Sequence, residues 1–324
     1  MNRLRAVLLG CGLTLFGVLL IRLGVQPVVD AFARLSWGVL LIVWFPFVLI
    51  NACDTLGWRF AFPRHRPPFR TLLTARLAGE AFNATTPGAS VAGEPIKALL
   101  IRDHVTYNES AASLVLAKTT ITISQVLFLA AGLALMPHRG VDPRLFHGLL
   151  IALAIAVAAT GAFVLVQTTR MLGAVAMLLT RLGLKALAEG SAIADAQIKG
   201  YYRDRPAALA LSIGLHFLGW VLNAGEALLI FTLLGISVSL PTVLGIEAAG
   251  TAVRFVTFFV PSHIGALEGG NVITFAAFGL DPATGLTFTL IRRVRELAWI
   301  AAGVLFVAYR NTPAIQGPAP TRGS

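Results

Sequence analysis

Two apolar stretches of this chain carry the same set of a proline, a carboxylate and a cation, and one offset of 174 residues relates them. In both stretches the proline precedes the carboxylate by seven residues and the cation by thirty-one. The residues are Pro87, Glu94 and Lys118 in the first stretch, and Pro261, Glu268 and Arg292 in the second. A charge or a helix-breaking proline is costly in apolar surroundings. Their recurrence in register therefore predicts a binding site for a charged ligand.

The composition predicts an integral membrane protein. Of the 324 residues, 56% are hydrophobic and 13% are charged, and the mean hydropathy is +0.79. An apolar segment of about 20 residues can cross the hydrocarbon core as a helix. Six such segments lie near residues 6–25, 36–57, 110–135, 145–168, 207–234 and 284–309. We therefore expect an all-α polytopic membrane protein with six full transmembrane helices, and we exclude a soluble domain with one apolar core.

Two further apolar regions, near residues 71–106 and 240–281, are interrupted by glycine, proline and charge. The interruption is Thr85–Ala89 in the first region and Val260–Gly265 in the second. Irregular backbone is tolerated at membrane depth where it is enclosed by protein or lines a wet cavity. We predict that each region is a re-entrant helical hairpin, which enters the membrane partway and returns to the same side.

Basic residues predict the orientation of the chain. The formal charge is +11, and many lysines and arginines fall in residues 58–70 and 168–206. Cytoplasmic loops carry such an excess, so we expect the cell inner membrane with both termini in the cytoplasm. The segment 168–206 alternates apolar and basic residues, as an amphipathic helix at the cytoplasmic surface does. Nucleic acid is not an expected partner, because the basic residues are explained by topology.

The offset of 174 residues also relates whole segments of the chain. It superimposes the span at 36–57 on 210–231 and the span at 110–135 on 284–309. We therefore expect one integral membrane domain over residues 1–324, with repeat units at about 36–135 and 210–309. Because the first hairpin opens to the cytoplasm and the second to the opposite side, the units form an inverted-topology repeat. Many secondary transporters build a substrate site between such units.

Several charged side chains in these segments are candidates for the site. Carboxylates exposed to lipid would cost roughly 2.5 to 3.5 kcal/mol each, so we expect them to face a cation or a wet interior. Helical spacing pairs Arg76 with Glu80 at i, i+4 and Glu94 with Lys97 at i, i+3. Two other predicted pairs are Arg292 with Glu296, and a contact between Glu80 and Arg254, which occupy the same position in the two units.

We assign these charges to two groups. The first group would bind a phosphate-bearing ligand. It contains four cations, two carboxylates and one amide, namely Lys97, Lys118, Arg254, Arg292, Glu94, Glu268 and Asn83. Structural ion pairs are an equal alternative for Arg76, Glu80 and Glu296. Arg293 falls on another helical face and is interpreted as reaching the membrane interface. His216 is interpreted as a packing or hydrogen-bonding residue rather than a proton relay, because the sequence shows no obvious partner for it.

The sequence indicates no chemistry that would make this protein an enzyme. We identify no set of metal ligands and no nucleophile paired with a base, so neither a metal nor another cofactor is expected.

The glycines of both interruptions have two interpretations. They allow a ligand to approach the backbone, or they allow tight helix packing, which is common in membranes.

The segment Gly79–Ala98 resembles a flippase-like membrane family that is related to the transmembrane region of lysyl-phosphatidylglycerol synthases. The family's first signature combines an asparagine, a proline, a Gly-Gly-Glu and a basic residue, and here Ala92 stands where the first of the paired glycines is usual. Its second signature is a Pro, Gly, Glu stretch before a last helix that bears arginine. The matching residues are Asn83, Pro87, Gly93, Glu94 and Lys97, and then Pro261, Gly265, Glu268 and Arg292.

The resemblance implies movement of a lipid or a polyprenyl-linked head group between leaflets. The soluble aminoacyl-transferase domain of the synthases is not recognised in the sequence, so lipid aminoacylation is not implied. We expect a translocase that moves a phosphate-bearing lipid by alternating access. The alternative is a non-transporting subunit that holds lipid and docks a lipid-modifying enzyme through residues 168–206. A membrane lipid is the expected partner in both cases.

Overall fold

The computed structural model describes residues 37–85, 93–169 and 185–311, with a few isolated positions before residue 37. All regular structure in these ranges is helical. The helices are α3 (Gly38–Phe60), α4 (Phe69–Thr85), α5 (Glu94–Leu100), α6 (Tyr107–Leu135), α7 (Pro143–Thr168), α9 (Lys185–Asp204), α10 (Pro206–Leu233), α11 (Leu240–Val256), η1 (Pro261–His263), α12 (Ala266–Ala277) and α13 (Pro282–Asn311).

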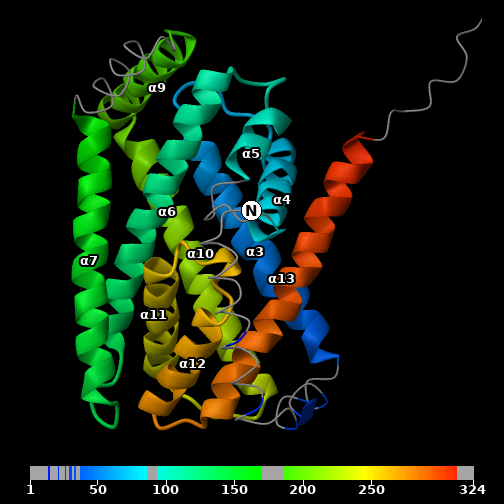
Figure 1. Ribbon diagram of the computed structural model, residues 1–324, viewed down its shortest axis with the longest axis vertical. Helices are drawn as coiled ribbons and strands as arrows, with labels where there is room; N and C mark the ends of the chain where they lie inside the picture. Colours follow the sequence, from blue (N-terminus) through cyan, green and yellow to red (C-terminus); the bar gives the residue numbers. More distant parts are fainter. Residues whose placement is uncertain are drawn as a thin grey trace, which may run out of the picture.

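Five long helices run along the long axis of the molecule (Figure 1), namely α3, α6, α7, α10 and α13. Three of them, α6, α7 and α10, are long and apolar enough to cross a membrane. These three match the spans predicted at 110–135, 145–168 and 207–234. Helices α3 and α13 occupy the positions predicted for two more spans, whereas the predicted span at 6–25 falls almost entirely outside the described residues.

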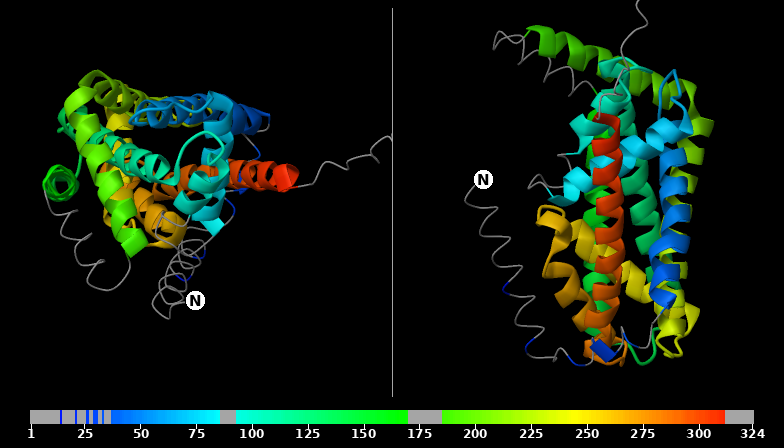
Figure 2. Two further views of the ribbon diagram at one scale, coloured as in Figure 1. Left: turned by 90° about the horizontal axis from the view of Figure 1, so that it is seen from above. Right: turned by 90° about the vertical axis from the view of Figure 1, so that its right-hand side faces the viewer.

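Four shorter helices form two helical hairpins. The pair α4 and α5 lies in one half of the long axis and the pair α11 and α12 in the other (Figures 1 and 2). In the second break Ser262 and His263 have φ of 47° and 52°, and Gly265 has φ of 81°. This left-handed conformation is unusual for non-glycine residues, and it separates η1 from the start of α12 at Ala266. The first break, residues 86–92 with Pro87 and Ala92, lies outside the described residues.

The hairpins pack against long helices that are distant in sequence. Helix α4 lies on α13, and α11 lies on α6, while α3 packs along α10 in the centre. A glycine allows close approach in both hairpin contacts. A Cβ at Gly303 of α13 would lie 2.5 Å from the backbone oxygen of Leu77. At Gly132 of α6 a Cβ would lie 2.8 Å from the backbone oxygen of Leu244. Small residues are typical of helix contacts in membranes, where they let backbones approach.

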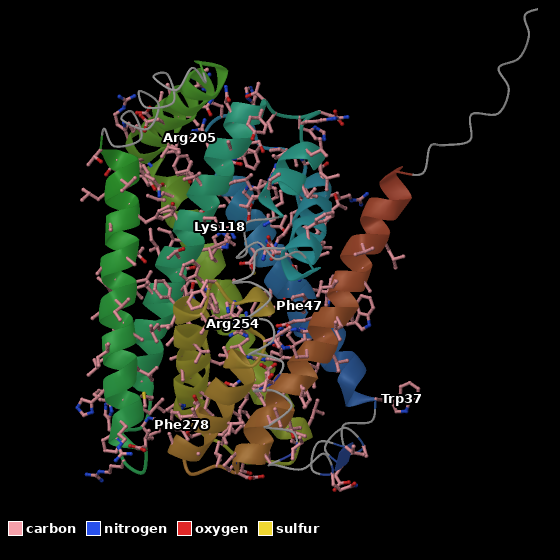
Figure 3. The ribbon with its side chains drawn as sticks, viewed as in Figure 1. Trp37, Phe47, Lys118, Arg205, Arg254 and Phe278 are labelled. Carbon is pink, nitrogen blue, oxygen red and sulfur yellow. The ribbon has the colours of Figure 1, made fainter. Side chains whose placement is uncertain are left out.

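The two basic segments lie at the same end of the molecule. Helix α9 crosses this end, and Figure 3 places Arg205 there. Tyr201 of α9 is buried against Phe62, and its hydroxyl donates to the Phe60 carbonyl at 3.0 Å. Burial raises the pKa of Tyr201 to about 12, so the hydroxyl stays protonated and remains a donor. The end of α13 points the same way.

The outer surface of the helical body is apolar. On α7, Ile151 is 62% exposed and Leu165 is 59% exposed, and on α13 Leu297 is 64% exposed. Large apolar patches are unusual on soluble monomers. Such a surface is that of a membrane protein, in which lipid covers these side chains.

Candidate functional site

The charged side chains within the helical body form two ion-pair networks, one at each hairpin. Figure 3 places Lys118 of α6 and Arg254 of α11 in the middle of the long axis, far from Trp37 and Phe278 at one end. We define the first network as Asp54, Arg76, Glu80, Glu94, Lys97, Lys118 and His216. We define the second network as Glu226, Glu247, Glu268, Arg292, Arg293, Arg295 and Glu296.

Glu94 is the first residue of α5, where its carboxylate suits the positive end of a helix. Its Oε1 atom lies 3.2 Å from Lys97 Nζ and 3.1 Å from Lys118 Nζ. Lys97 also contacts Glu80 Oε1 at 2.9 Å. The Lys97 side chain is only 6% exposed, whereas Lys118 is 39% and Glu80 is 45% exposed. Lys97 therefore holds α4 and α5 together, while Lys118 and Glu80 remain accessible.

Asp54 of α3 connects the first network to α10. Its two carboxylate oxygens contact different partners, Arg76 Nη2 at 2.6 Å and His216 Nδ1 at 2.9 Å. The His216 side chain is fully buried, and a Cβ at Gly57 would lie 2.6 Å from its Nε2 atom. This cluster joins α4 to the two central helices.

The backbones of α4 and α5 approach each other closely. A Cβ at Gly93 would lie 2.0 Å from the backbone oxygen of Gly79, so glycine is required here. Asn83 Oδ1 accepts a hydrogen bond from the Gly93 amide at 2.8 Å. Asn83 therefore connects the two helices across the break, and its Nδ2 atom is buried with no partner in the described part of the chain.

Arg292 of α13 lies in the second network among α10 and α11. Its guanidinium contacts Glu247 at 2.9 Å and Glu226 at 3.3 Å, and it donates to the Asn223 carbonyl at 2.9 Å. Arg295 also pairs with Glu226, whose side chain is fully buried. Arg292 is 6% exposed, so it stabilises the packing of α13 rather than facing a ligand.

Arg293, the next residue, points to the second hairpin. It contacts Glu268 and Glu296 at 2.9 Å each and donates to the Ser262 carbonyl at 2.8 Å. The other oxygen of Glu268 accepts from the Gly265 amide at 2.7 Å. Arg293 thus fixes the break between α11 and α12.

Arg254 lies near the end of α11 and is half-buried. Within the described residues it makes no ion pair and no hydrogen bond. Gly250, one turn earlier, leaves space beside the guanidinium, because a Cβ there would still lie 3.7 Å from Arg254 Nη1. Arg254 is therefore the cation best placed to accept an outside partner.

One of the predicted ion pairs is confirmed, namely Glu94 with Lys97. Arg76 does not pair with Glu80, because Asp54 of the neighbouring α3 is its partner. Glu80 instead contacts Lys97, so the predicted contact with Arg254 is also wrong.

The predictions for α13 were displaced by one residue. Glu296 pairs with Arg293 and not with Arg292, since successive helical residues are about 100° apart around the axis. Arg293 is only 18% exposed, so its predicted location at the interface is wrong. His216 also has a partner, Asp54, which the sequence did not indicate.

Six members of the networks were not among the predicted site residues. They are Asp54, His216, Glu226, Glu247, Arg293 and Arg295. Their position within apolar segments is a signal of function or pairing by itself. Their partners lie on helices far apart in sequence, which spacing does not reveal.

The charges of each half balance. The first network contains three carboxylates (Asp54, Glu80 and Glu94) and three cations (Arg76, Lys97 and Lys118). With Arg254, the second contains four carboxylates (Glu226, Glu247, Glu268 and Glu296) and four cations (Arg254, Arg292, Arg293 and Arg295). Neutral networks reduce the cost of burying charge in a membrane. The accessible members are Lys118, Glu80, Glu296 and Arg254.

A surface hollow of about 500 Å³ lies apart from these charges. It is lined by residues of α10 and of its connection to α11, including Leu228, Thr232 and Ser239. Its lining contains no charged side chain. The accessible charges, and not this hollow, are therefore the candidate site.

Comparisons with known proteins agree with the helical membrane architecture. The sequence profile described as "Lysylphosphatidylglycerol synthase TM region" matches residues 7–303 and confirms the resemblance seen in the sequence. A "UPF0104 membrane protein" of Methanothermobacter thermautotrophicus is 24% identical over 327 residues. That alignment covers 94% of this chain and 95% of the relative. No solved structure matches the chain.

Proposed function

Since the chain belongs to the lysylphosphatidylglycerol synthase transmembrane-region family, we propose that it moves a phosphate-bearing lipid or polyprenyl-linked head group between leaflets. The observation that carries this proposal is the set of accessible charges, which are Glu80 and Lys118 at the first hairpin and Arg254 and Glu296 at the second. Lys118 and Arg254 lie near mid-height in a body whose outer surface is apolar (Figure 3). Charges at such a depth commonly mark a path for a polar group.

Two cations of this group have the chemistry to bind a phosphate. The Lys118 ammonium is 39% exposed, and Arg254 is half-buried without a partner in the described part of the chain. Arginine and lysine donors form charge-assisted hydrogen bonds with phosphate. Glu80 and Glu296 are the accessible carboxylates, and they set the charge around the head group.

The other predicted site residues are buried or engaged with neighbouring residues, and they hold the helices that carry the accessible charges. Lys97, Arg292 and Glu268 are each at most 6% exposed and are fully engaged in ion pairs. Glu94 and Asn83 hold the start of α5. In this proposal they position the hairpins, and the head group contacts Lys118 and Arg254.

The packing of the helices supports an inverted repeat. The order long helix, hairpin, long helix occurs twice, as α3 to α6 and as α10 to α13. The contact of α4 with α13 has a counterpart in that of α11 with α6, and α3 with α10 forms the centre. The pair α4 and α5 lies toward one end of the molecule and the pair α11 and α12 toward the other (Figure 2), as hairpins that enter from opposite sides would. Rocking one unit against the other would expose the charges to each side in turn.

We further propose that the end with α9 faces the cytoplasm of a cell inner membrane. The basic segments at 58–70 and 168–206 share this end, in accord with the excess of basic residues in cytoplasmic loops. The first hairpin then opens to the cytoplasm and the second to the opposite side.

Leaflet exchange in reconstituted vesicles tests the proposal. The protein would be placed in vesicles of phosphatidylethanolamine and phosphatidylglycerol with a trace of fluorescent phospholipid, and a reductant that does not cross the membrane would report exchange. A parallel assay would use a polyprenyl phosphate. We expect Lys118→Ala and Arg254→Ala to reduce exchange at least about tenfold, because each removes a contact with the head group.

Lys199→Ala is the matched control. Lys199 is 33% exposed and pairs with Asp195 on α9, so it resembles Lys118 in exposure and pairing but lies at the end of the molecule. Its loss should leave exchange unchanged. Absence of exchange for every lipid would contradict translocation. Lipid retained on the purified protein in that case would favour the alternative, a subunit that holds lipid and docks a modifying enzyme.

A further inference from the structure

His216 and Asp54 form a buried pair whose chemistry the proposed function does not use. Their contact of 2.9 Å joins α10 to α3, the central helices of the two units. The imidazole is fully buried, and its Nε2 atom has no hydrogen-bond partner among the residues that the structure describes. A buried polar atom without a partner costs stability, so this arrangement calls for a role.

We propose that the Asp54–His216 pair is a proton-binding site that controls the availability of Lys118, on the premise of the lipid movement proposed above. An oxygen and a ring nitrogen at hydrogen-bond distance share at least one hydrogen. With one proton the pair has a charge of −1, and with two it is neutral. The second proton comes from water and resides on His216 Nε2, because Asp54 Oδ2 already accepts from the Arg76 guanidinium at 2.6 Å.

The groups around the pair determine what a second proton changes. Helix α4 contributes Arg76, which contacts Asp54, and Glu80, which lies one turn beyond it. Cys53 is the neighbouring titratable group on α3. Helix α6 contributes the Thr120 hydroxyl, which Ser212 contacts at 2.9 Å one turn before the histidine on α10. Lys118, also on α6, is close enough to Glu80 for an electrostatic attraction between the two charges.

Neutralising the pair removes the counter-charge of Arg76. Glu80 is the next carboxylate within reach, because it follows Arg76 by four residues on α4. Glu80 is then shared between Arg76 and Lys97, which is its present partner at 2.9 Å. Lys97 consequently moves toward Glu94, which it already contacts at 3.2 Å. Each step exchanges partners between groups that are already neighbours.

The last step weakens the contact between Glu94 and Lys118. Glu94 Oε1 is shared between Lys97 and Lys118, at 3.2 Å and 3.1 Å. A stronger contact with Lys97 weakens the contact of Glu94 with Lys118, so the exposed Lys118 ammonium is held less tightly when a phosphate approaches. Proton binding at the centre of the molecule thereby promotes head-group binding, and the two bindings are reciprocally coupled.

Chemical labelling of lysines tests this coupling without any lipid movement. The purified protein in detergent would be treated with an amine-reactive reagent, and mass spectrometry would give labelling of Lys118 relative to Lys199. This ratio cancels the intrinsic effect of pH on amines. Between about pH 8 and about pH 6 we expect the ratio to rise severalfold in the wild type. An unchanged ratio would overturn the proposal.

Two variants fix the pair in its two states. Asp54→Asn removes the negative charge, so the ratio should be high at both pH values. His216→Asn keeps an amide near the position of Nδ1 but cannot take a second proton, so the ratio should be low at both. His263→Asn is the control, because His263 is a half-buried histidine of the second hairpin, outside the first network, where it contacts the Thr257 carbonyl. It should retain the wild-type response.

The vesicle assay separates this proposal from the proposed function. If labelling responds to pH as expected but no lipid exchanges, the result supports the proton-binding site and contradicts lipid translocation. If lipid exchanges equally fast at both pH values and labelling does not respond, the result supports lipid translocation and contradicts the proton-binding site. If both hold, exchange should accelerate severalfold on acidification in the wild type and lose its pH dependence in Asp54→Asn.

Discussion

The two hairpins differ in what holds their second helix. Helix α12 is bound to α13 through Arg293, which bridges Glu268 and the Ser262 carbonyl. Asn271 adds a bond of 2.7 Å to Thr289 of α13. Helix α5 is tied firmly to α4, but its charged contact with α6 is the pair Glu94 with Lys118, whose lysine is accessible to solvent.

This difference indicates which hairpin moves. The acid and base at the start of each second helix are similar, yet Glu268 is 2% exposed and Glu94 is 13% exposed. Buried ion pairs are costly to break, whereas accessible ones contribute little to stability. We therefore expect the second hairpin to be a fixed part of its unit and the first to be the part that rearranges when a head group binds.

Removal of Arg293 should have the largest effect on stability. Arg293→Ala leaves the buried Glu268 carboxylate without its cation, and such a loss costs about 3 to 5 kcal/mol. Thermal unfolding in detergent should show a clear decrease in Tm. Lys118→Ala, the corresponding change at the first hairpin, should change the free energy of unfolding by about 1 kcal/mol or less. Equal losses of stability would contradict the difference between the hairpins.

A methyl group at Gly93 should have the next largest effect. In Gly93→Ala the Cβ would lie 2.0 Å from the Gly79 backbone oxygen, so α4 and α5 must separate, at about 1 to 3 kcal/mol. Gly270→Ala should cost less, because its Cβ meets the Val253 side chain, which can rotate. Gly161→Ala on α7 is the control, since no atom lies within 4 Å of its Cβ. Chemical unfolding of the three variants should rank them in this order.

Loss of the Asn83 side chain should have the smallest effect. Asn83→Ala removes the acceptor of the Gly93 amide, and one such hydrogen bond contributes about 1 kcal/mol. Hydrogen exchange at the start of α5 should become faster, while exchange in α12 should not change. Asn223→Ala is a suitable control, because the Asn223 side chain bonds only within its own helix, to the Gly219 carbonyl. Faster exchange in α12 as well would contradict independent motion of the first hairpin.

Much of the helical arrangement could be predicted from the sequence. Apolar runs of sufficient length located the long helices, because the hydrocarbon core requires about 20 residues per span. The break at Pro261 to Gly265 was located by residues that end a helix. Glu94 and Lys97 could be paired because three residues separate them on one helix. All of these are local properties of the chain.

The partners of the other charges could not be predicted in this way. Asp54 and His216 are 162 residues apart and meet only because α3 packs along α10. Twenty-four residues separate Glu94 from Lys118, but twenty-five separate Glu268 from Arg293, so a fixed offset selected Arg292 instead. The rotation of α13 is fixed by its packing on α4 at Gly303.

The sequence by itself determined that this protein lies in a membrane and that its buried charges must be neutralised. Hydrophobicity and the cost of desolvating a charge act on every residue, whatever its neighbours are. Only the tertiary structure decided which acid meets which base and which charges remain accessible. A contact between distant helices depends on their relative rotation and depth, and a change of one residue, or about 100°, turns a side chain toward a different partner.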